Sequence, residues 1–211
     1  MLSVAEGTIV LILCQVVGVC LLGDILHSHY PSAPTLTVNI LSSSAIAPVL
    51  TIFYLWLRTK CLPKFVLNRE ALLTAISGMV LVFIVSLLYV MIFKYNTFVK
   101  NLLSSPGNYK EINIFLFVIW GPLLEEVLFR GYILNLLKSY GKITALLITS
   151  ILFATLHLLF AGFSIDLYLL VESIFLVIYA MIYGVCYLNG GIVSAILAHV
   201  FCNLYFLVAN S

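Results

Sequence analysis

Long apolar stretches separated by short polar breaks dominate the pattern of this sequence. A membrane-spanning helix needs about 20 predominantly apolar residues, and this rule gives seven candidate spans. They run over residues 5–26, 36–57, 71–93, 112–137, 143–161, 166–188 and 191–209. No β-type alternation persists, which argues against a barrel. We therefore predict an all-α, polytopic transmembrane helical bundle of about seven helices, with six to eight as the range.

The distribution of Lys and Arg predicts an orientation for these spans. Six basic residues follow spans two and four, and three lie between spans three and four: Arg58, Lys60, Lys64, Arg69, Lys138 and Lys142 against Lys94, Lys100 and Lys110. Cytoplasmic loops carry the excess of Lys and Arg. The N-terminus is therefore predicted to be cytoplasmic, and the C-terminus external if seven is the right count.

Composition narrows the class of protein further. Hydrophobic residues make up 64% of the 211 residues and charged residues only 9%, whereas soluble domains are about 25% charged. These values exclude a soluble globular protein, a disordered chain and a nucleic-acid binder, and leave the lipid bilayer as the main surrounding. The N-terminus lacks signal-peptide features. The absence of long soluble extensions favours a multi-pass protein of a bacterial plasma membrane.

Three charges lie together inside one apolar span. Glu125, Glu126 and Arg130 fall within six residues of the span 112–137, where each charge costs about 2.5–3.5 kcal/mol on insertion scales. Glu126 and Arg130 have i,i+4 spacing and face each other, so a structural ion pair accounts for them. It does not account for Glu125, which lies about 100° away around the helix.

Other polar side chains occur in the later spans. His157 lies deep in the span 143–161, and His199 and Asn203 share one face of the last span. Each alone is typical of an interhelical hydrogen bond. A rise of 1.5 Å per residue, however, places Glu125 and His157 each about 21 Å from the side where their spans meet, and His199 and Asn203 about 12–18 Å from it. We therefore expect a polar site near the midplane.

This set of groups suits hydrolysis of a peptide bond. A carboxylate beside an imidazole can take a proton from water and return it to a leaving amine. A second imidazole and an amide can donate hydrogen bonds to the oxyanion. Zinc is the rival, because one Glu and two His, here Glu125, His157 and His199, form a known catalytic ligand set. The HExxH arrangement that would indicate zinc from local spacing is absent, but the residue identities alone do not separate a metal-free mechanism from a zinc-dependent one.

The same residues resemble the motifs of a known family. Glu125-Glu126-xxx-Arg130, Phe153-xxx-His157 and His199-xxx-Asn203 are similar to the three motifs of the CPBP intramembrane proteases, the family of CAAX proteases and bacteriocin-processing enzymes also called Abi. The resemblance covers a predicted catalytic core at residues 112–209. Residues 1–111 form a separate group of predicted helices without a recognised motif.

The resemblance implies a glutamic-type endopeptidase that needs no cofactor, with zinc as the alternative. Glu125 would be the general base that activates water, His157 would assist it, and His199 and Asn203 would form the oxyanion site. Glu126 and Arg130 would support the site. The substrate would be a membrane-associated peptide or protein cut near its C-terminus or inside it. A zinc protease that uses the same residues, a non-catalytic membrane scaffold and a transporter are the alternatives.

Several residues near span ends have simpler interpretations. Asp166 and Glu172 are expected to cap the sixth span at the interface, although Glu172 can also line a substrate entrance. Aromatic residues near span ends, among them Tyr89 and Tyr140, are expected in interfacial belts.

Overall fold

The protein is all-helical in the parts that the structure describes. The computed structural model describes residues 23–41, 46–94, 96–160 and 167–211. The helices are α2 (Gly23–His29), α3 (Thr35–Leu41), α4 (Ala47–Thr59), α5 (Arg69–Phe93), α6 (Thr97–Leu103), α7 (Tyr109–Phe115), α8 (Gly121–Glu126), α9 (Asn135–Leu137), α10 (Lys142–Phe160) and α11 (Leu167–Ala209). The all-α prediction is therefore confirmed over these residues.

Three of the described helices are long and apolar enough to cross a membrane: Arg69–Phe93, Tyr109–Tyr140 and Leu167–Ala209. Helix α10 is apolar but shorter. The predicted span 36–57 is described as two short helices, α3 and α4, which flank residues 42–45 outside the described part. Most of the predicted span 5–26 lies outside the described residues, so the count of seven stays a prediction.

Helix α11 consists of two antiparallel arms. Gly191 has φ 79° and ψ −173°, a backbone conformation essentially confined to glycine. The rings of Tyr183 and His199 stack at 4.4 Å, whereas sixteen residues of straight helix would separate them by about 24 Å. Ser194 Oγ closes the turn by donating to the Cys186 carbonyl at 2.8 Å. The arms thus correspond to the predicted spans 166–188 and 191–209.

The segment Tyr109–Tyr140 is one continuous helix with two π-helical stretches, Leu116–Trp120 and Val127–Leu134. Pro122 has no N–H to donate, and its ring clashes with the carbonyl group four residues earlier, so regular α-helical hydrogen bonding is disfavoured here. The Gly121 N–H accordingly bonds to the carbonyl of Leu116, five residues back. Such π-type irregularities are frequent at functional sites, and here they flank the turn that carries Glu125 and Glu126.

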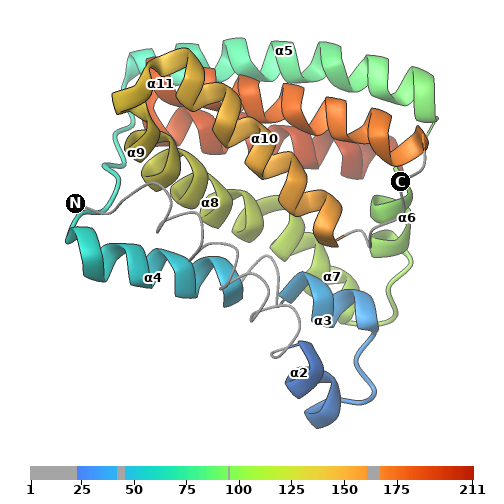
Figure 1. The fold of residues 1–211 in the computed structure, drawn as a ribbon. Coiled ribbons are helices and arrows are strands. Elements are labelled where there is room, and N and C mark those ends of the chain that lie inside the picture. The colour runs from blue at the N-terminus through green and yellow to red at the C-terminus, as the bar shows by residue number, and fades with distance from the viewer. Residues whose placement is uncertain (1–22, 42–45, 95, 161–166) are drawn as a thin grey trace.

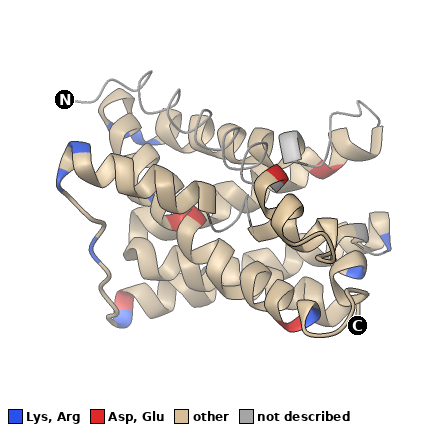
Figure 2. Ribbon diagram, turned by 90° about the horizontal axis from the view of Figure 1, so that it is seen from below, with Lys and Arg blue, Asp and Glu red and all other residues tan. Residues whose placement is uncertain are grey.

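Helices α10, α11, α3 and α4 pack around the Tyr109–Tyr140 helix, and α5 packs against α11. Helix α5 runs along α11, α10 crosses the bundle beside them, and α3 and α4 lie on the opposite side (Figure 1). Helix α5 exposes a row of large apolar side chains: Leu73, Ile76, Val80, Ile84 and Met91. Lys and Arg lie mostly at the two ends of the bundle (Figure 2). This arrangement is that of an integral membrane protein, in which lipid covers the apolar faces.

Candidate functional site

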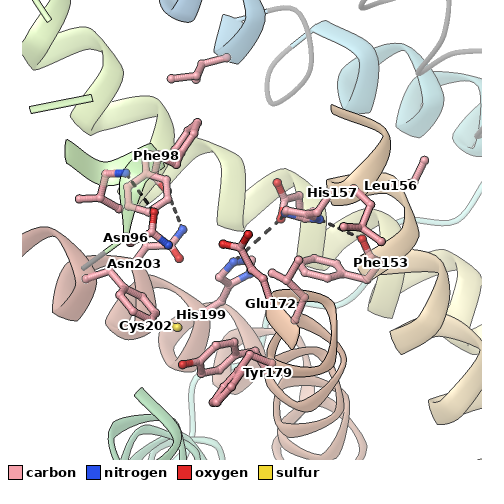
Figure 3. Close-up of a pocket in the computed structure, with 18 of the residues that line it drawn as sticks. Asn96, Phe98, Phe153, Leu156, His157, Glu172, Tyr179, His199, Cys202 and Asn203 are labelled. Carbon is pink, nitrogen blue, oxygen red and sulfur yellow. Dashed lines mark hydrogen bonds and ion pairs between the residues drawn. The ribbon is translucent and has the colours of Figure 1, made fainter. Parts of the chain in front are cut away.

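The predicted catalytic side chains line one cavity of about 380 Å³. Glu125 comes from α8, His157 from α10, and His199 and Asn203 from the second arm of α11. Figure 3 shows the two histidines and Asn203 among the lining side chains. The remaining wall is largely apolar and aromatic, as is usual for ligand-binding cavities. Three separate helical segments therefore converge on this space.

Glu125 is the centre of the polar cluster. Its Oε2 atom lies 3.9 Å from Nε2 of His157 and 3.9 Å from Nε2 of His199. These separations are too long for direct hydrogen bonds, but a water molecule beside the line that joins two such groups can hydrogen-bond to both. The carboxylate and the two imidazoles can therefore share one water.

The other ring nitrogen of each histidine fixes the orientation of the ring. His157 Nδ1 is 2.9 Å from the carbonyl oxygen of Phe153, which can only accept. His199 Nδ1 is 2.9 Å from Oε1 of Glu126, a carboxylate that also accepts from Arg130. Both Nδ1 atoms therefore carry the hydrogen, and both Nε2 atoms are left to face Glu125.

A buried ion pair lies behind His199. Arg130 Nη1 donates to Glu126 Oε1 at 3.0 Å, and the two side chains are 1% and 0% exposed. Arg130 Nη2 donates to the carbonyl of Ala180 at 2.6 Å, and its guanidinium lies 5.1 Å from the ring centroid of Phe153. The pair thus connects the Tyr109–Tyr140 helix to α10 and to the first arm of α11, while Glu126 holds His199.

Asn203 is held by the π-helical stretch that precedes Glu125. Its Nδ2 donates to the carbonyl oxygen of Phe117 at 2.8 Å. An amide nitrogen carries two hydrogens, so the second is available to a ligand in the cavity. The hydrogen bond fixes the amide on the cavity wall that also bears His199.

The zinc alternative is constrained by this geometry. Ligands about 2.0–2.1 Å from a tetrahedral zinc ion lie roughly 3.4 Å apart, closer than the 3.9 Å from Glu125 Oε2 to either Nε2. Within the described part of the chain, no group of three His, Cys, Asp or Glu residues has a metal-binding arrangement. The donor types suit zinc, but the side chains would have to move together to hold it.

The structure adds residues to the cavity that the sequence did not single out as a group. Glu172 lines it, and its Oε1 accepts a hydrogen bond from Tyr89 at 3.1 Å. Tyr89 is only 2% exposed, so its expected place in an interfacial belt is wrong. Tyr183 stacks on His199 with the rings 13° apart. No sequence signal marked Tyr89 or Tyr183, because both belong to apolar helices rich in aromatic residues. Asp166 lies outside the described residues.

The fold and the site together define an all-helical membrane protein with a cavity lined by Glu, His and Asn side chains. Residues 108–205 match the model of the Rce1-like family of type II CAAX prenyl endopeptidases. This confirms the resemblance to the CPBP and CAAX proteases over just under half of the chain. Nothing among curated proteins or solved structures matches the chain. The match to an endopeptidase family thus covers Glu125, His157, His199 and Asn203, whereas part of the cavity wall comes from earlier residues.

Proposed function

We propose that the protein is an intramembrane endopeptidase that hydrolyses a peptide bond by glutamate-activated water, without a covalent intermediate or a metal. The observation that carries the proposal is the geometry around Glu125. Two imidazole Nε2 atoms face one carboxylate oxygen at 3.9 Å inside an apolar cavity, and both rings are oriented through Nδ1. The family match supports the same reaction class.

In this mechanism a water molecule bound between Glu125 and His157 attacks the carbonyl carbon of the substrate. The water proton passes to Glu125, with His157 assisting, and then to the leaving amine nitrogen as the C–N bond breaks. Asn203 Nδ2 and His199 Nε2 donate hydrogen bonds to the oxyanion. To donate from Nε2 while Nδ1 donates to Glu126, the ring of His199 must carry both protons.

The substrate proposed for this site is a membrane-associated peptide or protein, cut near its C-terminus. A cavity lined largely by apolar groups suits a hydrophobic segment. We further propose the seven-helix topology with a cytoplasmic N-terminus in a bacterial plasma membrane. The counts of Lys and Arg between the spans support the orientation.

The oxyanion role of Asn203 gives a direct test. Asn203→Ala is expected to lower kcat by roughly 10²–10³-fold, the usual effect of removing one oxyanion donor, with a small change in KM. Cleavage is measured with purified protein in nanodiscs, by mass spectrometry of C-terminal membrane-protein fragments. Asn189→Ala is the matched control, because Asn189 donates to the Val185 carbonyl outside the cavity. Equal kcat values for Asn203→Ala and the control would contradict the assignment.

Metal removal separates the proposed mechanism from the zinc alternative. We expect chelator treatment followed by dialysis to leave the rate of cleavage unchanged, since the proposed reaction uses only side chains of the protein and a water molecule. Metal analysis of the same preparation gives the zinc content per chain. If activity disappears with the chelator and returns when zinc alone is added, the protein is a zinc-dependent protease and the metal-free mechanism is wrong.

A further inference from the structure

A second polar cluster lies in the same cavity as Glu125. Tyr89 on α5 donates to Glu172 on the first arm of α11 at 3.1 Å, and Asn96 Nδ2 donates to the Tyr89 hydroxyl at 3.2 Å. Asn96 also caps α6 by accepting from the Val99 N–H at 3.1 Å. All three residues line the cavity, and Figure 3 shows Asn96 and Glu172 with the two histidines and Asn203. The proposed mechanism uses none of these three groups.

Carboxylates outnumber Lys and Arg on the described wall of the cavity. Glu125 and Glu172 line it, whereas no Lys or Arg occurs among the described residues of its wall. All ten Lys and Arg of the chain lie in the described segments, so none of them is hidden near the cavity. Arg130 lies behind the wall and is already paired with Glu126. Apart from the ring of His199, which the proposed mechanism has doubly protonated against Glu125 and Glu126, the described wall therefore offers no side-chain cation to a substrate carboxylate.

We propose, building on the proposed proteolysis, that Glu172 selects substrates that place a basic side chain in the cavity and keep the free C-terminal carboxylate outside it. A Lys or Arg side chain in an apolar segment of the substrate gains a charge-assisted hydrogen bond with the carboxylate of Glu172, which Tyr89 holds in place. The free carboxylate of a substrate, if it lay beside Glu172, would face another negative charge in a poorly solvated cavity, where electrostatic repulsion is strong. Glu172 is thus a specificity-determining residue, and the scissile bond near the C-terminus lies far enough from that end to leave the free carboxylate outside the cavity.

Binding is tested first, in a variant that cannot turn over. Apolar peptides of about 20 residues carry a single Lys, Gln or Glu that is moved along the sequence, and each is titrated into Glu125→Gln protein in nanodiscs. In the best register, the Lys peptide is expected to bind roughly ten- to a hundredfold more tightly than its Gln counterpart. Adding Glu172→Gln should remove this preference, Glu172→Lys should reverse it toward the Glu peptide, and Glu172→Asp should keep part of it.

The matched control is Glu111→Gln, which removes an exposed carboxylate outside the cavity and should preserve the preference for Lys. Equal binding of the three peptides in every register, or a preference that survives both Glu172→Gln and Glu172→Lys, would overturn the proposal.

Cleavage of the same peptides by the otherwise unchanged protein distinguishes the two proposals. If all three are cut at equal rates and Glu172→Gln has no effect on the ratios, proteolysis stands and the role of Glu172 is wrong. If none is cut while Lys binding depends on Glu172, the cavity has the proposed specificity and the proposed proteolysis is wrong. Cleavage of the Lys peptide in preference to the Glu peptide, lost in Glu172→Gln, supports both.

Discussion

Glu125→Gln is expected to abolish detectable peptide-bond cleavage, with kcat lowered by roughly 10²–10⁴-fold, the range that general acid–base catalysis contributes. The amide has nearly the shape of the carboxylate but cannot accept and return the water proton. Both imidazole Nε2 atoms would still face the side chain across about the present 3.9 Å. Because the cavity wall is otherwise unchanged, binding of the substrate should persist while turnover stops.

The measurement combines single-turnover cleavage with peptide binding, both in nanodiscs. Glu111→Gln serves as the control for removal of a carboxylate, since Glu111 is exposed at the start of α7. Full activity of Glu125→Gln would show that another group activates water. Loss of both binding and activity would point to a structural role for Glu125 and would contradict the assignment of a general base.

Much of the candidate site follows from the sequence, because charges inside apolar spans are costly and therefore informative. Helical rise alone put Glu125 and His157 at one depth, and the structure places the two side chains 3.9 Å apart. Helical periodicity also predicted that Glu126 faces Arg130, which holds with a 3.0 Å contact. The catalytic roles of these residues stay predictions.

Tertiary contacts account for what the sequence did not reveal. Helical rise gives depth in a membrane but no rotation about the bundle axis, so nothing indicated that His199 Nδ1 would meet Glu126 and not Glu125. Tyr89 lies near a span end, as interfacial aromatics do, yet it packs against Phe93, Phe175 and Phe206. That packing brings its hydroxyl to Glu172.

The predicted span 36–57 illustrates a second reason why the structure differs from the sequence-based prediction. Hydropathy counts apolar residues but does not register where a helix begins and ends. Pro48 lies in the first turn of α4, and Lys60, in a left-handed conformation, ends it. The described part of this span therefore consists of the short helices α3 and α4.

Arg130→Met is expected to lower the free energy of unfolding by about 3–5 kcal/mol, the cost of breaking a buried ion pair from one side. The substitution leaves the carboxylate of Glu126, which is 0% exposed, without its cation. It also leaves the Ala180 carbonyl without the Arg130 donor. Unfolding is measured by denaturant titration in mixed micelles. Lys64→Met is the control, because Lys64 is exposed and such substitutions change stability by about 0.5 kcal/mol or less.

The double variant Glu126→Gln/Arg130→Met separates stability from catalysis. Removing both charges leaves no unpaired ion, so the double variant should be more stable than Arg130→Met alone, and the two losses should not add. Activity should not return with stability, because a neutral amide at position 126 gives His199 Nδ1 a weaker hydrogen bond than the carboxylate does and holds the ring less firmly. Equal stability of Arg130→Met and Lys64→Met would show that the ion pair contributes little. Recovery of both stability and turnover in the double variant would show that Glu126 serves only as the partner of Arg130, and that His199 donates to the oxyanion without it.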